Sequence, residues 1–320
     1  MVIATQRAKR PHAYARESRV TEAAKVVDCP FCSGNESQTP PEIYAVRPSG
    51  PRDGDGWRVR VVPNKFPAFG TEPAEPLAAD LLHPVRVGFG IHEVIIHSPD
   101  HEHSLGRMST DDVALIFTVY QERLRAAAER PGVEAAVVIV NHGAEAGASI
   151  RHPHSQLFAV PVVPPLIGRE LVRFREHRDS RGSCLLCDLI EDERSVGERI
   201  VIETENFIAF CPYASRVPFE TYIVPKEEAA DFSVAGEKIV REAAEITKSV
   251  LGRLLNGLGD VPYNIYLHTR PFHSNEPYHW HLAVLPKTSI IAGFEYATGI
   301  MINVVEPETA ADFLRENSGN

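Results

Sequence analysis

The segment from Asn141 to Gln156 carries the residue types that phosphoryl transfer needs. It reads NHGAEAGASIRHPHSQ, so a turn rich in Gly and Ala leads into two histidines and a glutamine at alternate positions. The mostly apolar residues 157–163 predict a strand, in which side chains alternate between the two faces. We therefore expect His152, His154 and Gln156 to share one face. There, one imidazole could attack phosphorus while the amide and the turn hold phosphate oxygens. The alternative is a pair of partly buried structural histidines.

Four of the five cysteines form two CxxC pairs, Cys29/Cys32 and Cys184/Cys187. In a reducing compartment this spacing is more typical of a metal site or of redox chemistry than of a structural disulfide. The fifth, Cys211, stands alone and is interpreted as a small buried side chain.

The first pair predicts a tetrahedral zinc site completed by His101 and His152. His103 competes with His101 for this role, and His97 is a weaker candidate. Four protein ligands leave no open position for water, so such a site would be structural. The alternative is two buried free thiols.

The second pair predicts a further metal site with His279. No histidine is available nearby as a fourth ligand in the segment IVPKEEAADF, so Glu228 or Glu227 would have to serve. A carboxylate makes such a site harder and less thiophilic. Structural thiols remain the rival interpretation.

The composition is that of an ordinary globular protein: 320 residues, 43% hydrophobic and 24% charged. The formal charge of -10 argues against a general nucleic-acid binder. No apolar run approaches the ~18–20 residues of a membrane span, and the start, MVIATQRAKRP, lacks the apolar core of a signal peptide. We expect a cytoplasmic protein.

The two halves of the chain repeat one order of motifs, which indicates an internal duplication. Each half has a CxxC pair, an Asn-aromatic-Pro segment, a strand, a long helix, a second strand and an HxH motif before an apolar strand. Helices are predicted after a cap at 110–112 and over 234–255, and a short helix after Pro307. The Pro-rich residues 160–165 predict a linker. We expect an α+β fold with domains 1–165 and 166–320, the second with a degenerate active site because Ala283 replaces the glutamine.

These motifs together resemble the galactose-1-phosphate uridylyltransferases, a branch of the histidine-triad superfamily. The matching segments span nearly the whole chain in order: RAKRP (7–11), CPFC (29–32), NKFPAF (64–69), HEVIIHSPDH (92–101), the segment 141–156, FCPYASRVPFE (210–220) and AGFEYATG (292–299). The resemblance implies two half-barrels, each with antiparallel strands and a crossing helix. It also implies that His154 is the nucleophile.

The resemblance assigns further roles, residue by residue. Asn64 and Phe66 match the segment that lines the base and ribose, and Gln156 matches the amide that stabilises the phosphoryl group. Arg7 and Arg10 match basic residues near the phosphates, and the loop that binds ribose and phosphates is matched by Asn141, Gly143, Ala148 and Ser149. Phe294 and Glu295 match residues that contact the hexose of the partner site in a homodimer. The zinc ligands are matched by Cys29, Cys32, His101 and His152. Glu228 stands where some relatives have a histidine.

The expected reaction is transfer of a UMP group from UDP-glucose to galactose-1-phosphate through a covalent uridylyl-His154. The same group includes a plant ADP-glucose phosphorylase with the variant HSHSQ, so an ADP-sugar or dinucleoside polyphosphate phosphorylase is the alternative. A third hypothesis is a non-catalytic nucleotide-binding protein whose fold is stabilised by zinc. The segment AGFEYATGIMIN (292–303) is expected to be a surface strand that reaches a neighbouring subunit, or else a buried strand in which Glu295 pairs with a cation.

Overall fold

The computed structural model describes residues 29–71, 82–83 and 88–319. Its named strands form one ten-stranded antiparallel sheet in the order β1-β2-β3-β5-β4-β9-β10-β8-β7-β6. The strands are β1 (Tyr44–Val46), β2 (Val59–Pro63), β3 (Ile91–Ile96), β4 (Ala135–His142), β5 (His154–Val160), β6 (Ile200–Glu203), β7 (Phe207–Phe210), β8 (Thr221–Pro225), β9 (Tyr263–His268) and β10 (His281–Pro286). The helices are α1 (Thr110–Ala128), α2 (Pro165–Arg181), α3 (Leu185–Val196), α4 (Glu237–Leu258), α5 (Gly293–Thr298) and α6 (Pro307–Glu316), with 3-10 turns at Glu36–Gln38, Ala144–Ala146 and Phe232–Val234.

The strand order is a palindrome about the β4–β9 pair. Outward from that pair, the first half runs β4, β5, β3, β2, β1, and the second runs β9, β10, β8, β7, β6. The HxH strands β5 and β10 therefore occupy equivalent places. The expected α+β class with antiparallel sheets is confirmed, and the two sheets join into one. The proposed domain boundary at 165/166 falls where β5 has ended and α2 begins.

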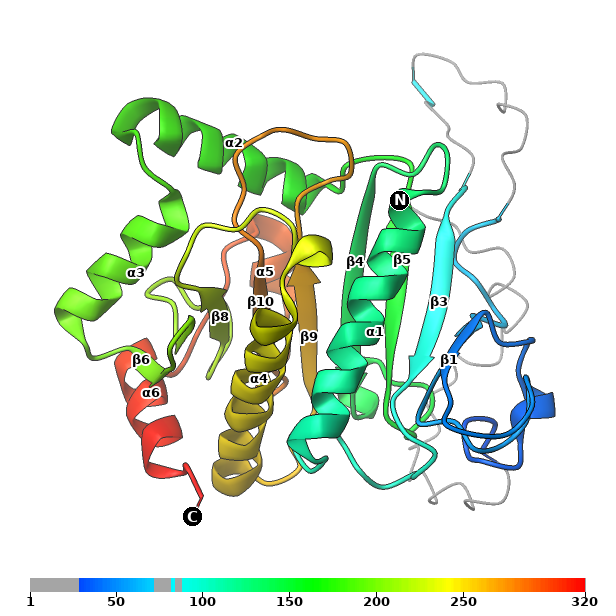
Figure 1. The fold of residues 1–320 in the computed structure, drawn as a ribbon. Coiled ribbons are helices and arrows are strands. Elements are labelled where there is room, and N and C mark those ends of the chain that lie inside the picture. Colours follow the sequence, from blue (N-terminus) through cyan, green and yellow to red (C-terminus); the bar gives the residue numbers. More distant parts are fainter. Residues whose placement is uncertain (1–28, 72–81, 84–87, 320) are drawn as a thin grey trace.

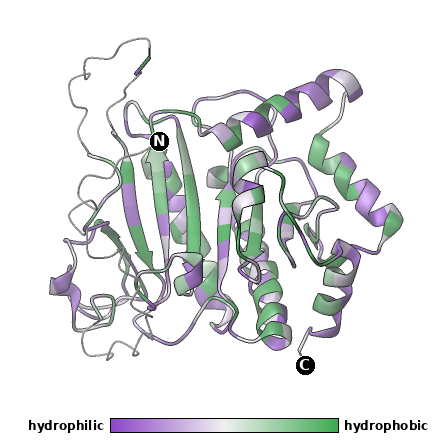
Figure 2. Cartoon of the chain, turned by 180° about the vertical axis from the view of Figure 1, so that it is seen from behind, coloured by the Kyte–Doolittle hydropathy of each residue, from purple (hydrophilic) through white to green (hydrophobic). Residues whose placement is uncertain are grey.

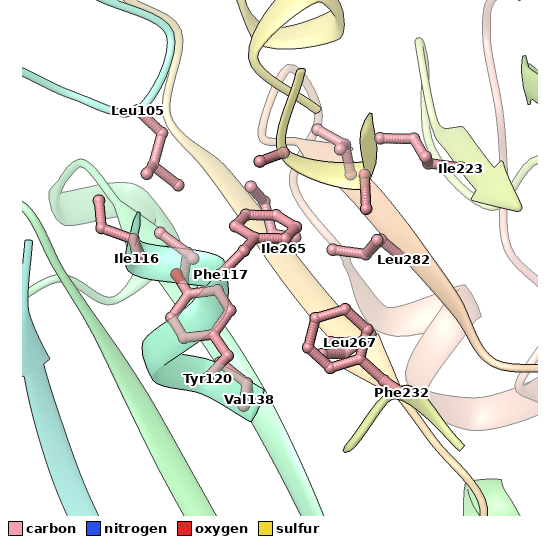
Figure 3. Close-up of a cluster of buried hydrophobic side chains, with 14 of the residues drawn as sticks. Leu105, Ile116, Phe117, Tyr120, Val138, Ile223, Phe232, Ile265, Leu267 and Leu282 are labelled. Carbon is pink, nitrogen blue, oxygen red and sulfur yellow. The ribbon is translucent and has the colours of Figure 1, made fainter. Parts of the chain in front are cut away.

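Helices α1 and α4 lie side by side across one face of this sheet (Figure 1). Ser109 caps helix α1: its hydroxyl accepts the N–H of Asp112 at 3.1 Å, so the cap lies one residue before the predicted 110–112. The buried core between helices and sheet includes Phe117 from α1 and Leu267 from β9 (Figure 3). Burial of each such side chain contributes about 1.5–3 kcal/mol to folding.

The opposite face of the sheet is covered differently in the two halves. In the second half, α2 and α3 pack on it, with Phe174 and Ile190 against Ile208 and Phe210; Figure 2 shows this side. In the first half, the segment that contains Phe31 and the CxxC pair packs on β2 and β3. The polar residues 173–183, which periodicity alone did not identify as helical, lie mostly in α2.

The expected strand at 292–303 is wrong. Residues 293–298 form α5, because Glu295 Oε2 accepts the N–H of Ala292 at 3.0 Å and Gly299, at φ 72°, ends the helix in the left-handed region. The segment is not buried either: Phe294 is 50% and Tyr296 79% exposed. Among the described residues, Glu295 has no salt-bridge partner, so the pairing expected for a buried strand is absent.

In the part of the chain that the structure describes, no helix has the length and apolar character needed to cross a membrane.

Candidate active site and metal centres

His154 is the first residue of β5 and faces away from α1 and α4. Its neighbours Ser155 and Leu157 are fully buried on the helix side, whereas His154 and Gln156 lie on the other face, as strand alternation predicts. His154 Nδ1 lies 2.7 Å from the backbone carbonyl oxygen of His152. Because a carbonyl only accepts, Nδ1 carries the proton and Nε2 keeps its lone pair.

The surroundings of His154 keep the ring neutral and oriented. Its side chain is buried, with the residue 7% exposed, and this desolvation lowers the pKa of the imidazole below its usual value. The ring of Phe31, from the CPFC motif, lies 5.2 Å from it in an edge-on arrangement. The result is an uncharged imidazole with its Nε2 lone pair available.

Gln156 is held by His92, a residue that the sequence analysis did not identify. His92 Nδ1 accepts the backbone N–H of Ala68 at 3.0 Å, so its proton is on Nε2, which lies 2.8 Å from Gln156 Oε1. The His92 ring also stacks on Phe158 with centroids 4.1 Å apart. The Gln156 carbonyl is thereby fixed toward His92, and its NH2 group is at the opposite end of the amide.

Asn64 and Phe66 lie next to this pair. Asn64 Oδ1 accepts the Phe66 N–H at 2.8 Å, and Asn64 Nδ2 lies 3.0 Å from His92 Nε2. Phe66 is 41% exposed, so its ring is accessible for contact with a ligand. The structure thus brings Asn64, His92 and Gln156 together.

The loop between β4 and β5 is tightly turned. Gly143 and Gly147 have φ of 82° and 90°, values that favour glycine. The N–H groups of Gly147 and Ala148 are already bonded inside the loop, to the carbonyl oxygens of Ala144 at 2.9 Å and Gly143 at 3.1 Å.

The backbone donors available to a phosphate are therefore fewer than the turn composition predicts. Ser149 is exposed, and its backbone N–H has no acceptor among the described residues. Of residues 147–149, Ser149 is therefore the one whose backbone N–H is left to donate to a ligand.

Cys29, Cys32, His101 and His152 come together in one buried cluster with ligand atoms within 4.8 Å of one another. The Sγ–Nδ1 distances are 3.7 Å for Cys29–His152, 3.5 Å for Cys32–His152 and 3.3 Å for Cys32–His101. A tetrahedral zinc with Zn–S of about 2.3 Å and Zn–N of about 2.0 Å would separate sulfur and nitrogen by roughly 3.5 Å.

The tautomer of His152 also suits a metal. Its Nε2 donates to the carbonyl oxygen of Ser98 at 2.7 Å, which leaves the Nδ1 lone pair facing the two sulfurs. The competing histidines lie elsewhere: His103 is exposed and pairs with Asp100, and buried His97 contacts the Ser155 hydroxyl. The residues present fit zinc.

The second cluster contains Cys184, Cys187 and His279, with His279 Nδ1 3.3 Å and 3.8 Å from the two sulfurs. Glu228 is outside this group of ligand atoms and instead forms an ion pair with Arg178. Glu227 is exposed. The three residues could hold a soft cation, and the structure does not bring either carboxylate into the cluster.

A third cluster, which the sequence analysis missed, lies at the second HxH motif. Glu170 from α2, His268 from β9 and His281 from β10 place ligand atoms within 4.8 Å of one another. His268 Nδ1 is 3.1 Å from both Glu170 carboxylate oxygens, and the Tyr278 hydroxyl donates to Glu170 Oε2 at 2.5 Å. Burial opposes ionisation of Glu170, but its bonds and charge interactions with His268 keep its pKa below the usual value. Glu170 lies on α2, a helix that the sequence did not predict, and for this reason nothing in the sequence indicated that a carboxylate would lie beside these histidines.

His281 occupies the place equivalent to His154. Its Nδ1 lies 3.1 Å from the His279 carbonyl oxygen, as His154 Nδ1 does to that of His152. Two residues on, the position of Gln156 is taken by buried Ala283. The second half therefore keeps the imidazole and lacks the amide.

Two groups of expected substrate residues are not placed at this site. Arg7 and Arg10 lie outside the described residues. Phe294 and Glu295 lie on α5, in an exposed segment that follows β10 in the second half.

Comparison with known proteins agrees with this arrangement. The model of the galactose-1-phosphate uridyl transferase N-terminal domain matches residues 1–164, and that of a domain of unknown function (DUF4921) matches residues 90–317. An ADP-glucose phosphorylase of Arabidopsis thaliana is 33% identical over 326 residues, covering 99% of this chain and 90% of the relative. A galactose-1-phosphate uridylyltransferase of Thermotoga maritima is 28% identical over 315 residues, covering 94% and 93%.

A solved structure gives the same picture. The crystal structure of an Arabidopsis thaliana ADP-glucose phosphorylase with bound ADP-glucose is similar with a TM-score of 0.81 and 32% identity, covering 90% of this chain and 89% of that one. The chain therefore belongs to the galactose-1-phosphate uridylyltransferase family of nucleotidyltransferases.

Proposed function

We propose that the protein transfers a nucleotidyl group from a nucleoside diphosphate hexose through a covalent nucleotidyl-His154 intermediate. The observation that carries this proposal is the bond from His154 Nδ1 to the His152 carbonyl oxygen at 2.7 Å, which leaves Nε2 as the nucleophilic nitrogen. The family membership supports the reaction class.

In the first step, the Nε2 lone pair attacks the α-phosphorus and the bond from this phosphorus to the bridging oxygen breaks. Hexose-1-phosphate leaves with that electron pair. Because the leaving group is a phosphate of low pKa, no strong general acid is required. In the second step, an acceptor oxygen attacks the same phosphorus, the phosphorus–Nε2 bond breaks, and its electron pair returns to the imidazole, which is neutral again.

Gln156 and Ser149 are the donors we assign to the phosphoryl oxygens. The Gln156 carbonyl is bonded to His92, so its NH2 group is the end available for this role. Donors fixed before the reaction stabilise developing charge without a reorganisation cost. Asn64 and Phe66 would contact the nucleoside, Asn141, Gly143 and Ala148 the ribose and phosphates, and Arg7 and Arg10 the phosphates.

The first candidate reaction takes UDP-glucose as donor and galactose-1-phosphate as acceptor. A second candidate takes ADP-glucose as donor and inorganic phosphate as acceptor. It is favoured by the 33% identity to an ADP-glucose phosphorylase over 99% of this chain. The two reactions share the His154 chemistry and differ in the base and acceptor pockets.

We further propose zinc at Cys29, Cys32, His101 and His152. A closed tetrahedral site would tie the CPFC segment to the residue two positions before the nucleophile and supply no chemistry of its own. A second metal at Cys184, Cys187 and His279, with Glu228 completing it, would require the Arg178–Glu228 ion pair to open. We propose a homodimer in which Phe294 and Glu295 reach the partner's hexose.

One experiment tests the function and separates the candidates. The protein is incubated with UDP-glucose alone or with ADP-glucose alone, and intact mass is measured. An added UMP or AMP mass supports the proposal and identifies the donor. If neither donor adds a nucleotidyl mass, the covalent mechanism is wrong.

A further inference from the structure

The loop that we assign to the phosphates rests on a strand of the other half of the molecule. This phosphate loop, residues 143–149, follows β4, and β4 pairs with β9 so that Asn141 lies opposite Asn264. Pro262 packs directly under the loop, because a Cβ atom at Gly143 would lie 2.8 Å from Pro262 Cβ. His142 Nε2 also lies 2.9 Å from Asp260 Oδ1. The phosphate loop thus packs on residues of the second half that lie in and just before β9.

Asn264 makes two side-chain hydrogen bonds to this part of the first half, one to Asn141 and one to the loop itself. Its Nδ2 donates to Asn141 Oδ1 at 2.8 Å and to the carbonyl oxygen of Ala146, inside the loop, at 2.9 Å. The Ala146 carbonyl can only accept, so Asn264 must present its NH2 group. Asn141 must then present its oxygen to Asn264. The Asn141 NH2 group is consequently turned toward the loop, where its Nδ2 lies 3.8 Å from a Cβ position at Gly147.

We propose that Asn264, a residue of the second half, is a positioning residue for nucleotidyl transfer. It sets the orientation of the Asn141 amide and, through the Ala146 carbonyl, the position of the phosphate loop relative to β9. This inference rests on the proposed function. It also gives the second half, which lacks an equivalent of Gln156, a part in the chemistry of the first. Neither the HPHSQ motif nor the family resemblance placed Asn264 near the site.

Replacement of Asn264 by Asp reverses the polarity of these contacts at nearly constant shape. A carboxylate cannot donate to the Ala146 carbonyl and repels it, and it draws the Asn141 NH2 group away from the loop. Asn256→Asp is the matched control. Asn256 is exposed on α4 of the same half, where its Nδ2 donates to the Asn317 carbonyl oxygen at 3.2 Å.

The experiment measures the maximal rate of nucleotidyl-His154 formation at saturating UDP-glucose or ADP-glucose, together with the thermal midpoint. We expect Asn264→Asp to lower this rate by between about 10- and 100-fold, as expected when a reacting phosphate is displaced by about 1 Å. The thermal midpoint should stay within a few degrees of wild type, and Asn256→Asp should leave the rate unchanged. Asn264→Ala, which removes both donors without adding charge, should slow the reaction in the same direction.

A double-mutant cycle isolates the route through Asn141. In an Asn141→Ala background, Asn264→Asp should lower the rate by a clearly smaller factor than in the wild type, since the orientation it controls is already lost. Equal factors in both backgrounds, or a wild-type rate in Asn264→Asp, would overturn the inference alone. If the wild type forms no nucleotidyl-His154 with either donor, the proposed function fails, and the inference fails with it.

Discussion

The Nδ1 atom of His154 donates to the backbone carbonyl oxygen of His152 at 2.7 Å, while His152 uses its own Nδ1 toward Cys29 and Cys32. The two histidines of one HxH motif therefore expose opposite nitrogens: Nδ1 of the first to a metal and Nε2 of the second to a substrate. The carbonyl oxygen that accepts from His154 belongs to His152, so the residue that sets the tautomer of the nucleophile is also a member of the metal cluster. A metal that holds His152 in place would also hold the acceptor that sets the tautomer of His154.

His154→Ala should abolish formation of the nucleotidyl-enzyme, because His154 supplies the attacking nitrogen, whereas His92, the imidazole bonded to Gln156, donates its Nε2 proton to the Gln156 carbonyl oxygen. Circular dichroism should show an intact fold, and initial-rate plots of the wild type should be parallel, as a covalent intermediate demands. His103→Ala, at an exposed histidine, is the control and should keep full activity. Intersecting lines, or turnover in the absence of His154, would be incompatible with the mechanism.

Peptide mapping of the labelled enzyme should find the nucleotidyl group on the peptide with His154 and none on the peptide with His281. The second half has Ala283 in place of the amide, and Glu170 is held beside His268, where its negative charge repels phosphate. Both peptides come from one sample, so each is the control for the other. Label on His281 would show that the second half is not degenerate.

Metal analysis should find at least one zinc per chain, and Cys29→Ser should destabilise the protein by more than about 4 kcal/mol, since metal binding at a closed site is coupled to folding. Thermal or denaturant unfolding measures this loss. Cys211→Ser is the control, because Cys211 is buried and stands outside the metal clusters found among the described residues. A fully folded, metal-free protein after mild purification would contradict the zinc assignment.

His92→Phe should lower the rate of nucleotidyl-His154 formation by roughly tenfold or more, because the stack on Phe158 is kept while the donor to Gln156 is lost. The rate at saturating donor is the quantity to measure. In a Gln156→Ala background the same change should have little further effect. A large additional loss there would mean that His92 acts independently of Gln156.

Glu295→Ala should raise KM for the hexose phosphate and weaken discrimination between sugars, with less effect on formation of nucleotidyl-His154. A carboxylate accepts from two adjacent hydroxyls, and the exposed segment around it is suited to contact with a second subunit. Glu306→Ala, at an exposed carboxylate before α6, is the control. Size-exclusion chromatography with activity measured across the peak tests the shared site, and a fully active monomer would reject it.

Local sequence was sufficient where chemistry depends on spacing along one element. The HxHxQ alternation puts His154 and Gln156 on one face because a strand has a period of two residues. Apolar spacing identified α1 and α4 for the corresponding reason in a helix, and the duplicated order of motifs anticipated the palindromic sheet.

Only the tertiary structure decided which residues meet across elements. His92 reaches Gln156 through the register of β3 on β5, Asn264 reaches Asn141 through the join of β9 to β4, and Glu170 reaches His268 from α2. A two-residue period assigns a side chain to a face of the sheet but says nothing of its neighbours on the next strand. Those neighbours follow from pairing between distant segments, which depends on the burial of the whole core. The same reason explains the error at 292–303, where local hydrogen bonds by Glu295 and Gly299 outweighed an apolar composition that suggested a strand.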